Sequence, residues 1–254
     1  MSSTGARKVS EVGAAHLADL NSGRAEARTL SEALAIDHRV LLSVVVPDAP
    51  AALVQAADEA QGLGVLKRMA AIGAALRLHL SADDLAALAS HPSDTVRGWW
   101  CFTTASDPTY DAPELLGACK PLADDSCFTV REWVWMAVRP RLVKNLTESI
   151  KLLVPWTGGD SANLRRFASE ALRPRGVWAG HIAALKANPR LGEPILEPLR
   201  SDPSRYVQDS VANWINDAAK TDPEWAVSLC ARWRAESSTP ETARTTSRAL
   251  RSLK

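Results

Sequence analysis

The chain has 254 residues, of which 46% are hydrophobic and 23% charged, as in globular proteins that bury a substantial core. No apolar run reaches the length of a membrane span, and the first residues lack the apolar stretch of a signal peptide. These features disfavour integral membrane and secreted classes, so we expect a cytoplasmic protein without a membrane partner. The four cysteines form no CxxC pair and no zinc-type spacing with the five histidines, which predicts free thiols and no metal site.

The net charge of +1 conceals two regions of opposite sign. Residues 1–130 contain 10 Lys and Arg against 16 Asp and Glu, whereas residues 131–206 contain 13 against 7. A basic region on a nearly neutral protein indicates a local site for a polyanion rather than a generally adhesive surface. The alternative is an ordinary solvated face on which these charges are scattered.

The first 90 residues lack the alternation of apolar and polar residues that predicts β-strands. Residues 1–16 predict a disordered or loosely ordered start, and residues 17–90 a set of short helices. Thr29 and Glu32 are spaced like a capping box at the start of one of them. We expect residues 17–254 to form a single helical domain, in which residues 91–254 are repeats.

A short pattern recurs from residue 90 onward: a polar turn, then an aliphatic residue and usually an arginine. Successive copies lie 34, 34, 43 and 36 residues apart, so each repeat has room for two or three short helices. The copies are Val96-Arg97, Val130-Arg131, Leu164-Arg165, Val207-Gln208 and the weaker Ala243-Arg244. The Trp, Gly and Tyr signature of tetratricopeptide repeats is absent. The sequence therefore predicts an all-α, HEAT-like helical repeat solenoid, an α-α superhelix.

The stretch 164–178, LRRFASEALRPRGVW, combines four arginines with one carboxylate and one tryptophan. Its apolar residues recur at the spacing of one helical face, which predicts the side that faces the core. These residues are Leu164, Ala168, Ala171 and Leu172. Arg166, Glu170 and Arg173 form a second stripe, which we expect to face away from the core. Pro174 predicts the end of the helix, because its ring cannot continue the hydrogen-bond ladder.

A similar pattern occurs one period earlier, in the stretch 130–142, VREWVWMAVRPRL. Both stretches contain Arg-Pro-Arg, at 139–141 and 173–175. The residues expected on the exposed face of the earlier helix are Glu132, Trp135, Met136 and Arg139. If the second helices of successive repeats line one surface, then Glu132, Glu170 and Asp217 converge there beside arginines and exposed tryptophans.

Each of these residues also has a structural interpretation. Glu170 is spaced for an ion-pair network with Arg166 and Arg173 on one helix, and Asp217 for a pair with Lys220. Four of the tryptophans fit a core, namely Trp99, Trp133, Trp214 and Trp225. Trp178 differs, because it follows a Pro-Arg-Gly turn where no apolar helical face requires it. No P-loop, dinucleotide fingerprint, nucleophile elbow or metal-ligand motif is present, so we expect no cofactor.

Several segments together carry a family resemblance. They are RTLSEALAID (28–37), HPSDTVRGW (91–99), VREWVW (130–135), LRRFASEALRPRGVW (164–178), YVQDSVANWINDAAKTDP (206–223) and RALRSL (248–253). These segments resemble the AlkC branch of the AlkC/AlkD alkylpurine DNA glycosylase superfamily, from about residue 17 to the C-terminus. The resemblance implies a HEAT-like solenoid that binds damaged duplex DNA on a concave basic face. It also implies excision of positively charged N-alkylated bases without flipping them out of the helix.

The same resemblance implies a catalytic site of carboxylates and a tryptophan. The matching positions are Glu170 and Trp178 in RFASE…RPRGVW, Asp217 in ANWIND and Glu132 in VREW. The phosphate anchors that we expect in the basic region are Arg139, Arg141, Arg166, Arg173 and Arg175. Some AlkC relatives continue into an immunoglobulin-like domain, whereas this sequence reaches Lys254 directly after the last repeat, and some superfamily members bind DNA without excising bases.

The chemistry of a cationic lesion suits these residue types. The alkylated base is already a good leaving group, so the enzyme has to stabilise an oxocarbenium-like sugar and position a water. An indole face adds a cation–π contribution of about 0.5–2 kcal/mol. We therefore predict a monomeric DNA glycosylase that acts on alkylated duplex DNA in the bacterial cytoplasm, at the nucleoid. The alternatives are a non-catalytic DNA-structure binder and a protein-interaction solenoid, and the basic excess disfavours the second.

Overall fold

The structure, a computed structural model, describes residues 5–176 and 178–253, and within these ranges the chain is all-α with no β-strand. The α-helices are α1 (Ala14–Asn21), α2 (Leu30–Ala35), α3 (His38–Val45), α4 (Ala51–Ala60), α5 (Val65–His79), α6 (Ala82–Leu88), α7 (Asp94–Ser106), α8 (Ala112–Ala123), α9 (Phe128–Lys144), α10 (Leu146–Leu153), α11 (Ala162–Glu170), α12 (Ala183–Ala187), α13 (Glu193–Leu196), α14 (Arg205–Ala219), α15 (Pro223–Glu236) and α16 (Pro240–Ala249). Short 3-10 helices are η1 (Val9–Glu11), η2 (Val154–Gly158), η3 (Pro189–Gly192), η4 (Glu197–Leu199) and η5 (Arg251–Leu253). The predicted all-α fold is confirmed. In the described ranges, no helix combines the length and the hydropathy needed to cross a membrane.

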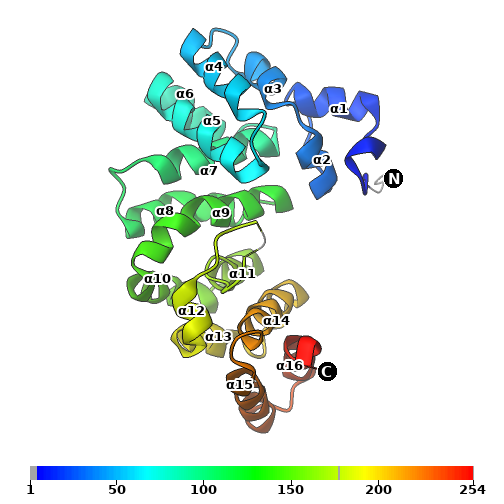
Figure 1. Ribbon diagram of the computed structural model, residues 1–254, viewed down its shortest axis with the longest axis vertical. Helices are drawn as coiled ribbons and strands as arrows, with labels where there is room; N and C mark the ends of the chain where they lie inside the picture. Colours follow the sequence, from blue (N-terminus) through cyan, green and yellow to red (C-terminus); the bar gives the residue numbers. More distant parts are fainter. Residues whose placement is uncertain (1–4, 177, 254) are drawn as a thin grey trace. The chain divides into compact units, whose positions relative to one another are not determined.

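The chain divides into two compact units, Met1–Val138 and Arg139–Lys254, which we call the first and second units and describe separately. In the first unit, α5 packs between α4 and α7, and α7 also contacts α6 and α8 (Figure 1). Gly73 lets α5 approach α7 closely, because a Cβ atom there would lie only 2.7 Å from the Cβ of Phe102. The prediction of one continuous domain over residues 17–254 stays a prediction.

Glu32 anchors the start of the chain. Residues 5–16, expected to be loosely ordered, include η1 and the beginning of α1. The carboxylate of Glu32 is buried and accepts the backbone N–H groups of Ala6 and Arg28 at 3.0 and 2.7 Å. Burial alone would raise the pKa of Glu32, but hydrogen bonds from Arg28 and Ala6 lower it to about 2. Thr29 caps α2 as predicted, while the Glu32 carboxylate binds these other groups instead of completing a capping box.

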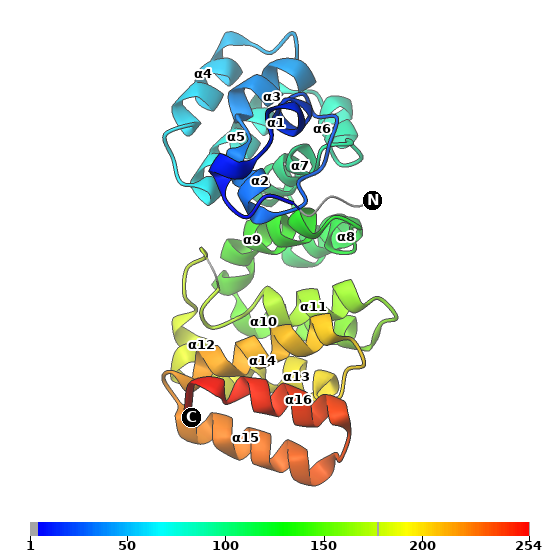
Figure 2. The ribbon, with the colours of Figure 1, turned by 90° about the vertical axis from the view of Figure 1, so that its right-hand side faces the viewer.

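In the second unit, α14 lies between α11 and α16, and α15 packs against both α14 and α16 (Figure 2). The long third period of the sequence contains α12, α13 and the short 3-10 helices around them, which lie between α11 and α14 in the chain. The four tryptophans assigned to the core are each at most 3% exposed, which confirms that assignment. They are Trp99, Trp133, Trp214 and Trp225.

The recurring arginine satisfies carbonyl groups of the turn that precedes its helix. Arg97 donates through Nη1 to the carbonyl oxygens six and five residues earlier, at 2.7 and 3.1 Å. Arg131 and Arg165 donate to the carbonyl oxygens at the same two positions before them. In the next copy, Gln208 donates to the carbonyl six residues earlier, at 2.7 Å. The sequence pattern recurs because each of these turns leaves backbone acceptors that need a long polar side chain.

Two of these arginines also reach the turn that opens the following repeat helix. Nε of Arg97 lies 2.9 Å from Oδ2 of Asp125, and Nε of Arg165 lies 2.6 Å from Oδ2 of Asp202. Each aspartate also accepts the backbone N–H of the residue two positions further on. Within each unit, adjacent repeats are therefore joined by a mostly buried ion pair as well as by apolar packing.

The repeat pattern located the helices well but not all their faces. Helices α7, α9, α11 and α14 each begin two residues before the aliphatic residue of the pattern. Pro174 lies beyond the end of α11 as predicted, whereas α9 continues through Pro140. The exposed face predicted for the stretch 130–142 is wrong, because Trp135 and Met136 are 1% and 6% exposed. A repeat helix that is covered on two sides has polar and apolar stripes that are both buried.

Candidate active site

Two packed helices of the second unit carry three of the nine predicted site residues. Helix α11 carries Arg166 and Glu170, and α14, which packs against it, carries Asp217. The polar stripe of α11 was expected to face away from the core. The structure corrects this expectation for Glu170 and for Arg173, which are 3% and 8% exposed, and Asp217 is similarly buried at 6%.

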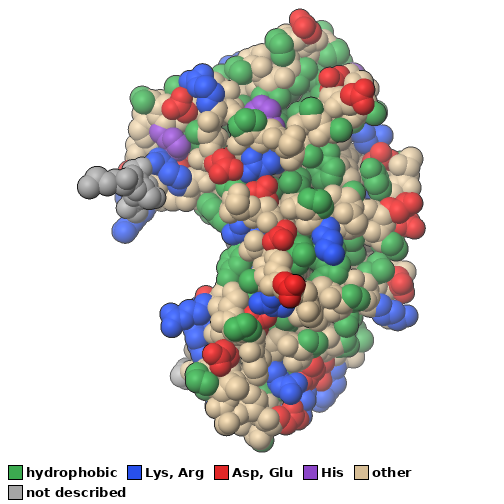
Figure 3. Space-filling view, turned by 180° about the vertical axis from the view of Figure 1, so that it is seen from behind, with side chains coloured by type: hydrophobic (Ala, Val, Ile, Leu, Met, Phe, Trp, Pro, Cys, Tyr) green, Lys and Arg blue, Asp and Glu red, His purple; other side chains and the backbone are tan. Residues whose placement is uncertain are grey.

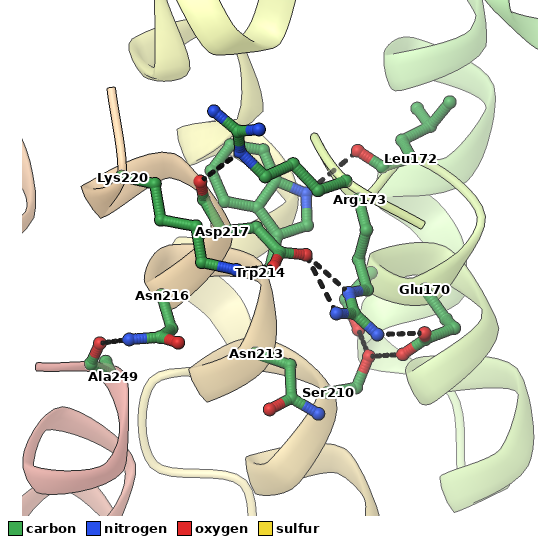
Figure 4. Close-up of polar contacts among 12 residues, drawn as sticks. Glu170, Leu172, Arg173, Ser210, Asn213, Trp214, Asn216, Asp217, Lys220 and Ala249 are labelled. Atoms are coloured by element: carbon green, nitrogen blue, oxygen red, sulfur yellow. Dashed lines mark hydrogen bonds and ion pairs between the residues drawn. The ribbon is translucent and has the colours of Figure 1, made fainter. Parts of the chain in front are cut away.

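Arg173 joins the two carboxylates (Figure 4). Its Nη1 donates to Oε1 of Glu170 at 2.7 Å, and its Nε and Nη2 both donate to Oδ2 of Asp217, at 3.0 and 2.8 Å. Burial alone would lower the pKa of Arg173, but the charges of Glu170 and Asp217 raise it above its usual value. Arg173 therefore stays a cation and makes charge-assisted bonds, which are the stronger kind. We call Glu170, Arg173 and Asp217 the carboxylate cluster.

Glu170 is ionised and hydrogen-bonded on both oxygens. The hydroxyl of Ser210 donates to Oε2 at 2.6 Å, and Nη2 of Arg166 lies 3.6 Å from the same oxygen. Burial alone would raise the pKa of Glu170, but the charges of Arg166 and Arg173 and the Ser210 hydrogen bond hold it below its usual value. Because the single proton of Ser210 points to Glu170, its oxygen remains an acceptor toward the hydroxyl of Ser169, 2.8 Å away.

The two oxygens of Asp217 have different surroundings. Oδ2 accepts both hydrogen bonds from Arg173, whereas Oδ1 faces Nζ of Lys220 at 3.6 Å, beyond ordinary hydrogen-bonding distance. The side chain of Lys220 is 50% exposed. Of the four carboxylate oxygens in the described cluster, Oδ1 of Asp217 therefore has the weakest protein contact. It is the oxygen best able to bind a water or a ligand.

The structure corrects the prediction of phosphate anchors at Arg139 and Arg173. Arg139 is 3% exposed, and its guanidinium donates to the carbonyl oxygens of Ala171 at 2.8 Å, Arg173 at 2.6 Å and Gly180 at 3.0 Å. Arg173 is occupied by the carboxylates. Since both guanidinium groups are buried against partners of this chain, neither is presented to an external phosphate.

The other three predicted phosphate anchors keep part of their side chains exposed. Arg166 stacks on Tyr206, with its Cζ 4.3 Å from the ring centroid. Arg175 donates through Nε to the backbone oxygen of Asp217 at 3.1 Å, and Arg141 is half-buried on α9. Their assignment as phosphate contacts stays a prediction.

Trp178 lies in a strained backbone conformation. Its φ is +62°, and no other non-glycine residue in the described part of the chain has a positive φ. Its side chain is 46% exposed. The left-handed region costs an L-residue about 1–2 kcal/mol. Such a conformation persists where the surrounding structure fixes it, and it often marks a functional position.

Glu132 belongs to the first unit and is described apart from the carboxylate cluster. Its Oε2 accepts a hydrogen bond from Nε1 of Trp135 at 2.9 Å, one turn along α9. Trp135 is buried, so it does not provide the exposed indole that was expected beside this carboxylate. Of the tryptophans linked to the site by sequence, Trp178 is exposed.

Sequence reasoning missed Ser210 and Trp214. Ser210 lies seven residues before Asp217, so the helical period places both on one face of α14, and this signal could have identified it. Trp214 donates through Nε1 to the carbonyl oxygen of Leu172 at 3.0 Å. No sequence signal distinguishes this bond from ordinary core packing, because the partner is a backbone group.

The positive charge of the second unit is interrupted by carboxylates. Figure 3 shows Lys and Arg side chains interspersed with Asp and Glu side chains on one face of the molecule. On α14 and α16, Asp209 pairs with Arg244 and with Arg248, each at 2.8 Å. Binding of a polyanion here would therefore compete with existing ion pairs.

Comparison with known proteins gives partial matches in sequence and a nearly complete one in structure. No family model matches the chain. The uncharacterized protein YhaZ of Bacillus subtilis is 42% identical over 97 residues, which is 38% of this chain and 27% of YhaZ. The alkylpurine DNA glycosylase AlkC of Pseudomonas fluorescens, solved bound to DNA containing an abasic site analog, is 26% identical with a TM-score of 0.69. That match covers 98% of this chain and 65% of the AlkC chain, so this chain spans less than two thirds of either relative.

Two further solved structures share the fold. AlkD2 from Streptococcus mutans has a TM-score of 0.61 at 19% identity, over 78% of this chain and 95% of its own. The smu.31 protein from Streptococcus mutans has a TM-score of 0.60 at 20% identity, over 78% and 98%. The predicted HEAT-like helical repeat class is confirmed by these neighbours. The match to AlkC, at 26% identity over nearly the whole chain, supports a place in the AlkC/AlkD superfamily, whereas the two less similar structures show the shared fold.

Proposed function

We propose that the protein is a DNA glycosylase that releases positively charged N-alkylated bases, such as 3-methyladenine, from duplex DNA without flipping them out of the helix. Two findings support this proposal. The second unit contains a buried carboxylate cluster in which Arg173 joins Glu170 and Asp217, and the AlkC structure that matches almost the whole chain is an alkylpurine DNA glycosylase bound to DNA. Duplex DNA with alkylated bases is thus the proposed partner, bound by a monomer in the bacterial cytoplasm and without a cofactor.

The observation that carries the proposal is the asymmetry of Asp217. Arg173 fixes the carboxylate through Oδ2, which leaves Oδ1 with one long contact to the exposed Lys220. A carboxylate held in this way is preorganised, so it pays little reorganisation cost when positive charge develops nearby. We assign to Asp217 the stabilisation of the oxocarbenium-like sugar and the orientation of the attacking water.

In this proposal, Glu170 has a different role from that of Asp217. Both of its oxygens are hydrogen-bonded within the protein, to Arg173 and to Ser210, so it contributes charge rather than an open oxygen. Its negative charge keeps Arg173 in place and offsets part of the arginine's positive charge at the site. Glu132 remains a third proposed carboxylate.

Trp178 is the proposed aromatic contact to the lesion. Its indole is exposed and follows the segment that carries Arg173. A cationic base over the face of an indole gains about 0.5–2 kcal/mol. Arg141, Arg166 and Arg175 are the proposed phosphate contacts, which would hold the backbone while the carboxylates face the positively charged base.

The test is release of free base from two matched duplexes, one containing 3-methyladenine and one containing uracil. We expect release of the cationic base and none of the neutral one. Asp217→Asn should reduce the single-turnover rate by about 100-fold, the size typical of a lost electrostatic or acid–base contribution. Asp209→Asn is the matched control, because Asp209 lies on the same helix in a separate ion-pair network. Wild-type rates in Asp217→Asn, or equal release of uracil, would contradict the proposal.

One observation favours a non-catalytic DNA-structure binder as the second candidate. Three cations form ion pairs with the two carboxylates of the cluster, so its net field is weaker than that of two bare carboxylates. They are Arg166, Arg173 and Lys220. In that case the protein would bind duplexes with an abasic site analog or an alkylated base and release no base. The excision assay distinguishes the two candidates directly.

A further inference from the structure

The segment that follows α11 is held by side chains from two other helices. Helix α11 ends at Glu170, so the last carbonyl groups of the helix and turn have no intrahelical partner. Trp214 of α14 donates to the carbonyl oxygen of Leu172 (Figure 4). The backbone N–H of Ile182 donates to the carbonyl oxygen of Pro174 at 3.0 Å. The carbonyls of Ala171 and Arg173 are satisfied by Arg139 of α9.

Arg139 also binds the far end of the same segment. Its Nη2 and Nε lie 3.0 and 3.3 Å from the carbonyl oxygen of Gly180. The segment rests directly on the guanidinium at Gly176, where a Cβ atom would lie 3.3 Å from Cζ and 3.5 Å from Nη2 of Arg139. One planar group thus contacts the segment before, at and after its turn.

The segment bears two groups that the proposed chemistry needs in fixed positions. Trp178 lies between Arg173 and Gly180, the residues whose carbonyls Arg139 binds, and it adopts a positive φ. The side chain of Arg173 fixes Asp217. A shift of this backbone would therefore move the indole and the carboxylate support together.

We propose that Arg139 is a positioning residue, which holds residues 171–176 and 178–180 so that Trp178 and the carboxylate cluster are preorganised for excision, and that it makes no contact with DNA. The proposal rests on the proposed function, because it assigns Arg139 a task in that same site. It replaces the phosphate-anchor role that the basic sequence region suggested.

The chemistry of the guanidinium explains why arginine is required. Burial, followed by the charge of Arg173, lowers the pKa of Arg139 to about 10, so the group is still protonated at neutral pH. Its planar fork presents several N–H groups in fixed directions, whereas lysine offers one compact ammonium on a flexible stem. A lysine at this position therefore cannot bind the carbonyls of Ala171, Arg173 and Gly180 together.

The first measurement is excision by Arg139→Lys. We expect the single-turnover rate to fall by about 10- to 100-fold, as for a site displaced by about 1 Å, while the affinity for duplex DNA changes little. The slope of log affinity against log salt should stay at the wild-type value, because no phosphate contact is lost. A slope reduced by about 0.9 would identify Arg139 as a phosphate anchor and overturn the proposal.

The second measurement needs no catalytic activity. Trypsin cuts after arginine unless proline follows, so Arg173–Pro174 is resistant and Arg175–Gly176 is the susceptible bond of this segment. We expect Arg139→Lys to accelerate cleavage at Arg175–Gly176. An unchanged cleavage rate in a folded Arg139→Lys variant would overturn the proposal. If the wild type released no base at all, the proposed function would fail, and this measurement together with the salt slope would still decide whether Arg139 orders the segment.

Two further variants separate positioning from general destabilisation. Arg165→Lys is the matched control, because Arg165 is a largely buried arginine of the same unit that also binds turn carbonyls and an aspartate. It should lower the melting temperature without changing the excision rate or the cleavage at Arg175–Gly176. Gly176→Ala keeps Arg139 intact but presses a methyl group against its guanidinium, and should change both measurements in the same direction as Arg139→Lys, to a smaller extent. Equal effects of Arg165→Lys and Arg139→Lys on excision would overturn the proposal.

Discussion

The two units differ in the charge state of several buried groups, although Glu32 of the first unit is also buried and has a lowered pKa. In the first unit, burial lowers the pKa of His38 to about 3 and that of His91 below its usual value, and it raises the pKa of Asp94. Each of these shifts favours the neutral form. In the second unit, the pKa of Glu170 is lowered and that of Arg173 is raised, so buried groups are kept charged.

This difference distinguishes buried groups that are neutral parts of the core from a charged cluster that the stability of the core does not require. A buried ion pair rarely contributes more stability than apolar side chains of the same shape, because desolvation offsets the attraction. The first unit also contains ion pairs, but these reach the surface: Glu26, the partner of Arg97, is 43% exposed. Glu170, Arg173 and Asp217 are each at most 8% exposed, so their charged contacts are better explained by a task other than stability.

Removing the central arginine of each unit gives the largest expected effect. Arg173→Met leaves Glu170 and Asp217 buried without compensation, so the free energy of unfolding should fall by about 3–5 kcal/mol. Arg97→Met leaves one partner, Glu26, that can turn to water, and should cost clearly less. Urea unfolding at neutral pH measures both. Equal losses would remove the distinction between the two units.

Mild acid should affect the first unit before the second. The folded-state pKa of His38 is lowered from 6.5 to about 3 by burial and by the charge of Arg68, with Asp37 opposing. Its contribution to stability is therefore complete above pH 6.5 and decreases as the pH falls toward 3, by up to about 1.4 kcal/mol per pH unit. Glu170 has a lowered pKa, so its contribution is complete above about pH 4.5 and is lost only as the pH falls below that value.

Hydrogen exchange of the two units between pH 6.5 and 4.5 tests this order. The first unit should lose protection while the second keeps it. His38→Gln should make the stability of the first unit less dependent on pH in this window, although it disturbs the bond from Nε1 of Trp99, 3.1 Å from Nδ1 of His38. Simultaneous loss of protection in both units would show that the buried charges of the second unit are no more acid-resistant than the neutral groups of the first.

Two serine hydroxyls give a smaller and more local comparison. Ser210 donates to the ionised Glu170, whereas Ser106 of the first unit donates to the neutral carbonyl of Thr103 at 2.7 Å. Ser210→Ala should cost about 1.5–3 kcal/mol and Ser106→Ala about 0.5–1.5 kcal/mol. Thermal unfolding of the two variants measures the difference. A cost for Ser210→Ala no greater than that for Ser106→Ala would mean that Glu170 does not depend on this bond.

The smallest expected effect concerns DNA binding by an arginine of the second unit whose side chain is partly exposed. Arg166→Ala should reduce the slope of log affinity against log salt by about 0.9, if it contacts one phosphate. Arg39→Ala in the acidic first unit, where the side chain of Arg39 is 59% exposed, should leave the slope unchanged. Fluorescence titration of a duplex at several salt concentrations provides both slopes. Equal slopes in the wild type and Arg166→Ala would remove Arg166 from the DNA interface.

The helical repeat fold could be predicted because each repeat contains the same short-range contacts at the same sequence positions. Helices α7, α9 and α11 each begin two residues before an aliphatic–arginine pair, and that arginine binds carbonyls of the turn before its helix. Bonds between residues close in the sequence produce a residue pattern that recurs at a fixed spacing and can be recognised. The pairing of Arg165 with Asp202 does not, because the two residues lie 37 positions apart.

The sequence named Glu170, Arg173 and Asp217 as candidates, and the structure brings them together, but their burial was not predicted. Helical periodicity correctly placed Glu170 and Arg173 on a stripe separate from the apolar one, yet it could not show that α14 covers this stripe. Arg139 illustrates the same limit, since its bonds to Ala171, Arg173 and Gly180 are to backbone oxygens. Every residue has a carbonyl oxygen, so no residue type in the sequence indicates such partners.

The arginine–aspartate pairs between repeats also determine where the chain tolerates a change of length. The pair Arg97–Asp125 spans 28 residues and the pair Arg165–Asp202 spans 37, yet both have the same bonds. The second interval is longer because of the segment between α11 and α14, which includes Trp178. Insertions there cost little loop-closure entropy and leave the stacked helices in register. Trp178, the proposed aromatic contact to a lesion, thus lies in the part of the repeat whose length varies, whereas Glu170 and Asp217 lie on the stacked helices α11 and α14. Selection or design could therefore alter the surroundings of Trp178 without rebuilding the scaffold.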